Sequence, residues 1–479
     1  MTSSRIGARR FFLKNTQFLR VFAACIILML VAPSALVAHT KLLRSDPANG
    51  ASLSASPSSI RLVFSEAAIA ELASIRLGLL GASGVLLSSP RYDATSRNEL
   101  IFDIRSSLAP GRYRATWSTA SRDGHVIKGT IEFQVAVPDT NSAAGLDTSA
   151  IAGRPAASPD QEPESIAGVS EPSTAIAISG AFGAFAARWL GFMALFIVIG
   201  SIAFRFGVLR RLGRNEDDDS FLHIASTNAA TFGIVAAVAG LLSALLRLNR
   251  EIADMPDIPV TQVLGATAWG WSWLLHVIAT LILASALRGV HRAKGRSRSN
   301  LWNLALGAVL AMSFVPSLSG HAIGGQTALI TFPADVLHVI AGSAWLGTLT
   351  VIVVVGIPAA LKSAEHVRPG ARVAAMINVF SPMALICGGL VVASGVISSV
   401  VRLKPLSSLW TTPYGVTLAI KLFFVAILFG AGAWNWRRMK PRLTGDDAVV
   451  PMRSVASLEV ILACVVLGIT AVLVAIELP

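Results

Sequence analysis

The chain has 479 residues, enough for several soluble domains, but its composition excludes a protein that is water-soluble throughout. Hydrophobic residues make up 53% and charged residues only 14%, and the mean hydropathy is +0.64. So few charges cannot cover so much apolar sequence, so much of the chain must face lipid. The net charge of +13 could suggest a nucleic-acid partner. However, Lys and Arg gather in short segments between apolar runs, as membrane topology requires, and we expect no nucleic-acid binding.

The first 38 residues have the pattern of a secretory signal peptide. A basic region ends at Arg20, an apolar core runs from Val21 to Val31, and small residues lead to Ala38. Cleavage after Ala38 would make His39 the first residue of the exported protein. An uncleaved membrane anchor is the alternative.

Residues 39–137 alternate between apolar and polar side chains in short runs, for example at 60–64, 113–117 and 131–135. Such period-two runs, broken by Gly, Pro, Ser and Asp, predict an all-β sandwich, immunoglobulin-like or cupredoxin-like, with about seven short strands. All three cysteines lie in other, apolar parts of the chain, which excludes a disulfide framework in this segment. Residues 138–175 are rich in Ala, Ser, Pro, Gly, Asp and Glu and predict a flexible linker.

Residues 176–479 contain apolar segments that are each long enough to cross a bilayer as a helix. They predict an all-α membrane domain of eight spans: 176–208, 222–247, 264–288, 300–317, 334–357, 377–401, 414–436 and 454–476. The loops that would be cytoplasmic hold most of the basic residues, while the opposite loops hold Arg250, Arg402 and Lys404. This bias predicts a multi-pass protein of the bacterial inner membrane with its N-terminal domain in the periplasm.

The N-terminal segment offers a nitrogen and oxygen ligand set for a metal ion. A freed His39 would chelate through its α-amine and its imidazole. Asp123 and His125 lie two residues apart, so in extended backbone their side chains leave the same face. This set suits Cu²⁺, and its affinity should fall at acid pH because the ligands must be deprotonated. The alternative is that Asp123 and Gly124 form an ordinary turn beside a surface histidine.

Several polar residues of the membrane segment are candidates for function, because ionisable side chains in apolar helices are costly. His321 and His338 would both lie at the outer mouth, and Met312 could supply a softer ligand deeper in the bundle. Asp335, His338 and Trp345 are spaced to share one helical face. We expect Asp335 to orient the His338 ring by a hydrogen bond.

Lys421 and Glu459 are predicted to lie deep in their helices, at different depths. Each needs a polar partner inside the bundle, and Asn435 and Arg188 are the candidates. The alternative is that both residues only fix the packing of the helices.

The exported segment resembles the periplasmic copper-binding family CopC. The resemblance rests on the sequences beginning at His39, the turn 46–50, the segment 62–66, and Asp123-Gly124-His125 followed by Gly129. It implies that His39, Asp123 and His125 bind Cu²⁺, with Glu66 at or near the metal. The segment lacks the Met-rich Cu⁺ site of some members, so we expect a domain that binds Cu²⁺ alone.

The membrane segment resembles the CopD copper-transport family. The motifs are 320–322, Asp335 and His338 with 345–347, 413–415 with Lys421, 434–435, and Glu459. The resemblance implies passage of copper as Cu⁺ or Cu²⁺, with uptake as the expected direction.

Together these features predict a fusion that captures copper in the periplasm and passes it through the membrane, without enzymatic activity. Periplasmic copper chaperones are candidate partners. The chain has neither a P-loop nor the phosphorylation motif of an ATP-driven pump. Two alternatives remain open: a redox enzyme that uses the N-terminal histidine site like a copper mono-oxygenase, and a haem-binding electron-transfer bundle.

Overall fold

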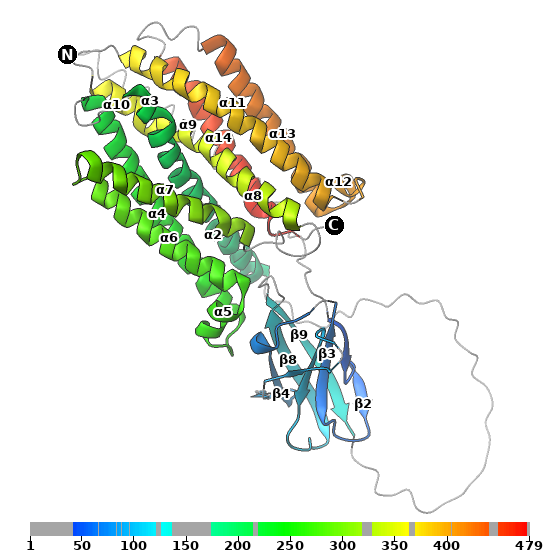
Figure 1. Cartoon of the computed structure of the whole chain (residues 1–479). Helices are drawn as coiled ribbons and strands as arrows, with labels where there is room; N and C mark the ends of the chain where they lie inside the picture. Colours follow the sequence, from blue (N-terminus) through cyan, green and yellow to red (C-terminus); the bar gives the residue numbers. More distant parts are fainter. Residues whose placement is uncertain are drawn as a thin grey trace, which may run out of the picture. The chain divides into compact units, whose positions relative to one another are not determined.

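The computed structural model describes residues 42–65, 67–82, 84–87, 89–94, 96–120, 126–136, 174–213, 219–318, 328–363, 369–403, 405–439 and 449–476. The chain divides into two compact units, one built from strands and one from helices. Figure 1 shows the elements of both, and each unit is described by itself.

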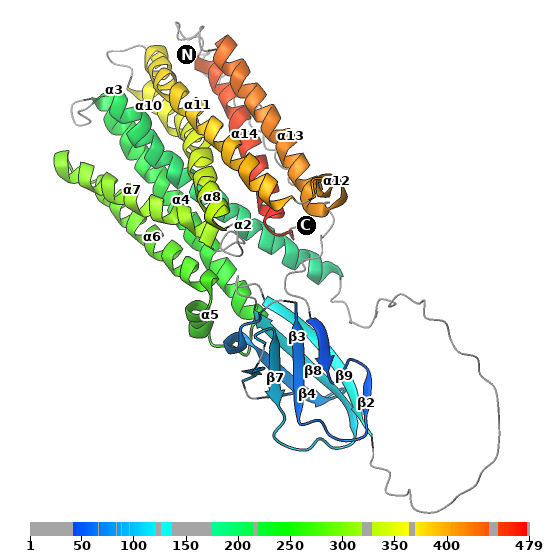
Figure 2. The ribbon, with the colours of Figure 1, turned by 45° about the vertical axis from the view of Figure 1, so that its right-hand side comes forward.

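The strand unit is a sandwich of two sheets, as predicted (Figure 2). One sheet has the order β1-β3-β7-β6 and the other β2-β9-β8-β4-β5. Its nine described strands exceed the seven expected, because β5 and β6 are only two residues long. The strands are β1 (Leu42–Asp46), β2 (Ala51–Leu53), β3 (Ser59–Phe64), β4 (Ser74–Leu79), β5 (Val85–Leu86), β6 (Arg91–Tyr92), β7 (Glu99–Asp103), β8 (Gly111–Ala120) and β9 (Val126–Val135), with a 3₁₀ turn, η1, at Ala70–Leu72.

The core of this unit consists of the apolar residues that alternate along the strands. On β3 the even-numbered residues 60, 62 and 64 are buried, and the polar neighbour Arg61 is not. The two sheets meet where Phe64 packs edge-on against Trp117 of β8, with ring centroids 5.4 Å apart. A Cβ atom on Gly129 would lie 2.6 Å from the Trp117 ring, so only glycine fits there. The period-two pattern therefore specified this core correctly.

The helical unit contains eight apolar helices long enough to span a membrane among the residues that the structure describes, which matches the number predicted. The spans are Phe182–Leu212, Ser220–Asp254, Ala268–Val290, Gly295–Leu318, Leu329–Lys362, Pro369–Arg402, Pro413–Arg437 and Met452–Leu473. The continuous α-helices among them are α2 (Thr174–Ala203), α4 (Ser220–Asp254), α6 (Ala268–Val290), α7 (Gly295–Leu318), α8 (Ala328–Gly342), α11 (Pro369–Arg402), α13 (Pro413–Trp434) and α14 (Val449–Leu473). Short helices complete the unit: α3 (Arg210–Leu212), α5 (Val260–Ala266), α9 (Thr348–Val351), α10 (Ile357–Lys362) and α12 (Ser408–Thr411).

The two ends of the helical unit differ in their content of basic residues. Figure 1 shows α3 and α10 at one end, and α5 and α12 at the other. The first end carries the basic residues Arg210, Arg211 and Lys362, as expected for the end that the bias of Lys and Arg assigns to the cytoplasm. The alternation of helix directions therefore agrees with the predicted path through the membrane.

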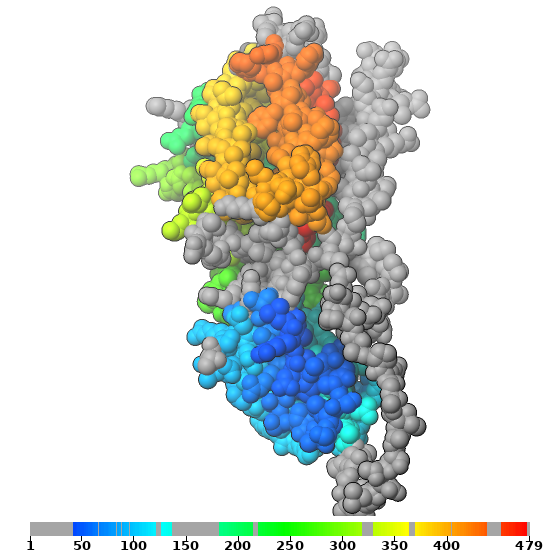
Figure 3. Space-filling model, turned by 90° about the vertical axis from the view of Figure 1, so that its right-hand side faces the viewer, coloured from blue at the N-terminus to red at the C-terminus, as the bar shows by residue number. Residues whose placement is uncertain are grey.

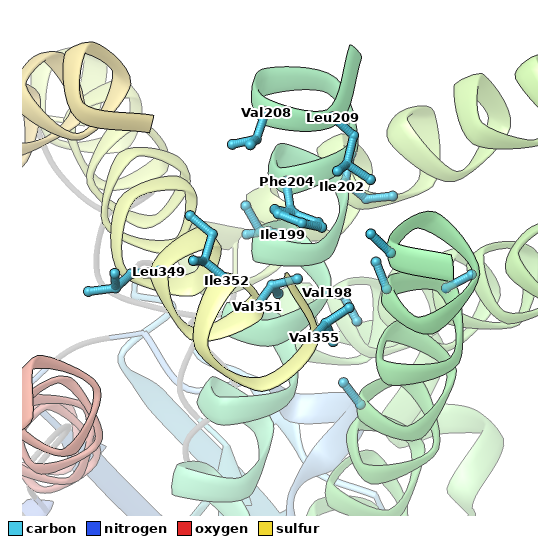
Figure 4. Packing of buried hydrophobic residues seen from close by; sticks show 14 of the residues in the cluster. Val198, Ile199, Ile202, Phe204, Val208, Leu209, Leu349, Val351, Ile352 and Val355 are labelled. Atoms are coloured by element: carbon cyan, nitrogen blue, oxygen red, sulfur yellow. The ribbon is translucent and has the colours of Figure 1, made fainter. Parts of the chain in front are cut away.

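The centre of the helical unit is the contact between α2 and the fifth span. Figure 4 shows Val198, Ile202 and Phe204 packed near Val351 and Val355. The two backbones approach so closely that a Cβ atom on Gly200 would collide with the backbone of Gly347. Small residues at such crossings are typical of packed membrane helices.

Four segments of these spans are π-helical: η2 (Phe204–Leu209), η4 (Ser343–Gly347), η5 (Ile352–Gly356) and η6 (Asn435–Met439). A π-turn adds one residue to a helical turn and is frequent at functional sites. The fifth span contains two of them, and η4 begins five residues after His338.

Candidate functional site

The expected ligands of the strand unit, His39, Glu66, Asp123 and His125, lie outside the described residues, as does His321 of the membrane segment. Among the described residues, no group of three or more His, Cys, Asp or Glu side chains could hold a metal ion. The remaining candidates are described, and most of them gather between α8, α11 and α13.

The facing sides of α8 and α11 are joined by a ladder of polar contacts. His338 Nδ1 lies 3.1 Å from Ser394 Oγ. Ser398 Oγ donates to Asp335 Oδ1 at 2.8 Å, and Arg402 forms an ion pair with Asp335 Oδ2. The two helices run in opposite directions, so residues three apart on α8 meet residues four apart on α11.

Asp335 was expected to orient His338, and this prediction was wrong. The His338 ring contacts Ser394, whereas both Asp335 oxygens are engaged by Ser398 and Arg402. Asp335 and His338 of α8 therefore form their hydrogen bonds with side chains of α11 and not with each other. The sequence does carry a signal for this ladder: Ser394, Ser398 and Arg402 occupy every fourth position of an apolar helix.

The hydrogen bonds around Ser394 define the tautomer of His338. The Ser394 hydroxyl donates to the carbonyl of Leu390 at 2.6 Å, so its oxygen accepts from Nδ1–H of His338. The ring nitrogen that keeps its lone pair is then Nε2. A neutral imidazole fixed in this way is the usual arrangement of a metal-binding histidine. Gly395 leaves room for the ring, since a Cβ there would lie 3.4 Å from His338 Cε1.

Charged and polar groups of α13 join the same network. The Tyr414 hydroxyl hydrogen-bonds with Arg402, and Lys421 interacts electrostatically with Arg402, Asp335 and His338. Because Lys421 is two turns along the helix from Tyr414, both face the α8–α11 ladder. The ladder together with these two residues is called the outer polar network below.

The start of α13 explains why its motif contains a proline and a glycine. Thr412 caps the helix by accepting a hydrogen bond from Gly415 N–H at 3.1 Å, and Pro413 occupies the first turn, where a missing N–H is harmless. A Cβ atom on Gly415 would collide with the Ser408 carbonyl oxygen. This cap fixes the position of Tyr414 beside Arg402.

Trp345 supports the network from one side. Its ring packs on Phe429 of α13 with centroids 4.8 Å apart, and it lies 3.7 Å from the Cβ position of Gly388 on α11. Gly388 is seven residues from Gly395, which lies under His338. Trp345 and His338 therefore face α11 together, as the spacing predicted.

Met312 is buried, but its contacts lie toward α6. The hydroxyl of Thr280 donates to Met312 Sδ at 3.8 Å. Within the described part of the chain, Met312 makes no hydrogen bond with His338. Its role as a copper ligand stays a prediction.

Glu459 of α14 has the partner that was expected. Asn435 Nδ2 donates to Glu459 Oε1 at 3.0 Å. The other candidate partner, Arg188, instead lies near Arg247 and Arg250 and donates to the Ala184 carbonyl.

The other described histidines of the spans occupy separate positions. His223 Nδ1 lies 3.0 Å from Arg298 NH1, and His276 forms a hydrogen bond with the backbone of Gly240. Within the described part of the chain, neither histidine contacts His338.

Comparison with known families agrees with the two units. The chain matches the CopC domain over residues 42–136. It matches the copper resistance protein D-like N-terminal domain over 179–331 and copper resistance protein D over 374–473.

Individual proteins show the same relationship. The copper transport protein CutJ of Bacillus subtilis is 23% identical over 435 residues, which is 88% of this chain and 72% of CutJ. Protein YobA of Escherichia coli is 33% identical over 25% of this chain and 97% of YobA. Copper resistance protein C of Xanthomonas campestris is 32% identical over 22% of this chain and 86% of its own length. The chain therefore belongs to the copper resistance proteins, as a fusion of a CopC domain with a CopD membrane domain.

Proposed function

We propose that this protein binds copper in the periplasm and carries it across the inner membrane. The observation that carries the proposal is the joining, in one chain, of a CopC domain to eight apolar helices that match CopD. The similarity to CutJ, a copper transport protein, extends over both parts.

In this proposal, Cu²⁺ binds first to the strand unit. Signal peptidase frees the amine of His39, which chelates the ion together with its own imidazole. Asp123 and His125 complete a tetragonal set that suits Cu²⁺, with Glu66 nearby. Because 138–175 acts as a tether, the bound ion is kept at a high effective concentration near the membrane site.

The second binding step uses His321 and His338 at the outer mouth, as Cu⁺ or Cu²⁺. His338 supports this role because Ser394 fixes its ring and leaves Nε2 as the ligand nitrogen. Met312 is a candidate ligand deeper in the bundle. Asp335, Lys421 and Trp345 position the site through the outer polar network, and they are not assigned as ligands.

The charges around His338 oppose the approach of a cation and so set a requirement on this step. A cation that approaches His338 meets the Lys421 ammonium, which opposes it, and the Asp335 carboxylate, which favours it but is paired with Arg402. Copper binding must therefore be strong enough to overcome the nearby positive charge, which selects a tightly coordinated metal over a weakly held one.

Copper accumulation in cells tests the proposal. The variants are His39→Ala and the double variant His321→Ala/His338→Ala, and the matched control is His291→Gln, an exposed histidine outside the spans. Lower cellular copper in both variants, with the control unchanged, supports uptake. Higher copper in both would indicate export, and unchanged copper would contradict transport.

A further inference from the structure

Glu459 is a buried carboxyl group without a charged partner. It lies within the last span and its exposed fraction is 4%. The structure gives it one hydrogen bond, from Asn435 Nδ2, and no ion pair in the described part of the chain. An ionised carboxylate in such surroundings would carry a large desolvation cost that one neutral hydrogen bond does not offset.

Among the side chains that the structure describes, the elements packed around Glu459 offer no cation to balance it. On α13 the charged residue is Lys421, which belongs to the outer polar network. In the described part of α11, the only titratable residue between the terminal arginines Arg372 and Arg402 is Cys387. The fifth span has none between His338 and Lys362. On α14, Arg453 lies six residues earlier and Cys464 five residues later, and on η6 the exposed Arg437 follows Asn435 by two positions. None of these groups forms a hydrogen bond or an ion pair with Glu459 among the described side chains.

Asn435 supplies the second observation. Its Oδ1 atom is buried and has no hydrogen-bond partner among the described residues. A buried acceptor without a donor is unusual and costs free energy. An ionised Glu459 can only accept hydrogen bonds, but a protonated Glu459 also donates one. One proton therefore lowers the cost of both the buried carboxyl group and the unsatisfied amide oxygen.

The backbone is shaped to hold this pair. Asn435 is the first residue of the π-helical segment η6, and Gly432 lies one turn before it. A Cβ atom on Gly432 would lie 3.7 Å from Glu459 Oε2, so the carboxyl group rests against this face of α13.

We infer that Glu459 and Asn435 form a proton-binding site inside the helical bundle. One proton from water adds to the Glu459 carboxylate to give the neutral acid, and its release restores the carboxylate. The pair lies in the half of the bundle that the predicted orientation places toward the cytoplasm, since Asn435 is two residues from the end of the span Pro413–Arg437. His338 lies in the other half, so the proton site is separate from the metal site.

Infrared difference spectroscopy of the full-length protein in lipid tests this inference. We expect the carbonyl stretch of a protonated carboxylic acid, sensitive to deuterium exchange, in the wild type and its loss in Glu459→Gln. The matched control Asp257→Asn changes a carboxylate in the loop between α4 and α5 and should keep the band. If wild type and Glu459→Gln show the same carboxylic acid bands, the inference is overturned.

A second variant keeps the test valid if Glu459→Gln does not fold. Asn435→Leu retains Glu459 but removes the amide, so the same band should remain and move to higher frequency, because its carbonyl loses a hydrogen-bond donor. An unchanged band would show that Asn435 takes no part and would overturn the paired site.

The use of this proton in copper movement rests on the proposed function, and flux into proteoliposomes separates the two. We expect a pH gradient to change copper flux in the wild type and to have no effect in Glu459→Gln. If the wild type moves no copper while the infrared band persists, the proposed function fails and the proton site stands. If copper moves and Glu459→Gln responds to the gradient like the wild type, the proton site has no part in transport.

Discussion

The two units place their polar and apolar groups in opposite ways. In the strand unit, apolar residues such as Phe64 and Trp117 form the core, and ion pairs such as Arg91–Asp103 lie at the surface with both side chains more than half exposed. In the helical unit, the side chains of Arg402 and Asp335 are only 24% and 20% exposed. The surface of this unit is apolar instead: Figure 3 shows α11 and α13 on the visible face, and Leu385 of α11 is 79% exposed.

This difference follows from the solvent that each unit meets. In water, the burial of apolar area is thermodynamically favourable, so the strand unit is stabilised by its core and gains little from surface ion pairs. Lipid offers no such gain between helices, so close backbone contact and interior hydrogen bonds take that role. Four predictions test this comparison, beginning with the largest expected effect.

The close crossing of α2 and the fifth span should be essential for the helical unit. Gly200→Leu places a side chain against the backbone of Gly347 and should cost more than about 3 kcal/mol, beyond ordinary overpacking. We expect folded protein to be lost in size-exclusion chromatography. Gly183→Leu, on the same helix but with open space around its Cβ position, is the control and should fold. Equal recovery of both variants would contradict the packing argument.

The metal site of the strand unit should depend on a free amino terminus. Acetylating the α-amine of His39 in the mature protein preserves every side chain but removes the chelating amine. We expect the Kd for Cu²⁺ to rise by at least about 100-fold, or about 2.7 kcal/mol. Competition titration with a chelator measures this, and His291→Gln is the control. Affinity should also fall with pH, because the amine and imidazoles must be deprotonated. An unchanged Kd would rule out chelation by the amine.

The interior ion pair should stabilise the helical unit more than surface pairs stabilise the strand unit. Arg402→Ala leaves Asp335 without its charged partner and should cost about 1–3 kcal/mol, less than a fully buried pair because both side chains retain some exposure. The matched surface variant, Arg91→Ala, should cost less than about 1 kcal/mol. A double-mutant cycle with Asp335→Asn isolates the pair from other losses. Equal costs for Arg402→Ala and Arg91→Ala would remove the distinction between the units.

The smallest effect concerns the orientation of His338. Ser394→Ala removes one of the two hydrogen-bond partners of the His338 ring, leaving the backbone of Val391, and should weaken copper binding at the membrane site by about tenfold. Ser398→Ala, one turn away, loses only a hydrogen bond to Asp335 and should bind copper like the wild type. Titration of the full-length protein with His39 replaced by alanine isolates the membrane site. Equal effects of the two substitutions would show that His338 is not held by Ser394 for metal binding.

Much of the fold could be predicted because its patterns repeat along the chain. Alternation at 60–64 identified the buried face of β3, and apolar length identified the eight spans. The short strands β5 and β6 were missed because two residues are too few to show a period.

The contacts between helices were harder to predict. An apolar span carries little periodic contrast, so the sequence does not show which neighbour each face meets. Asn435 and Glu459 were matched because few polar groups were available to either. Asp335 and His338 were paired wrongly because they are close along one helix. In the structure, each of them contacts a residue of the neighbouring helix α11 instead. The serines of α11 were overlooked, although their four-residue spacing marks a polar stripe.

The π-helical segment η4 sets the rotational phase between two halves of the fifth span. The additional residue of η4 lies between His338 and Gly347, and Gly347 is in close contact with Gly200 of α2. In a continuous α-helix of the same sequence, Gly347 would be turned by about 100° relative to His338. The wide turn of η4 therefore lets one span direct His338 toward Ser394 of α11 and Gly347 toward Gly200 of α2.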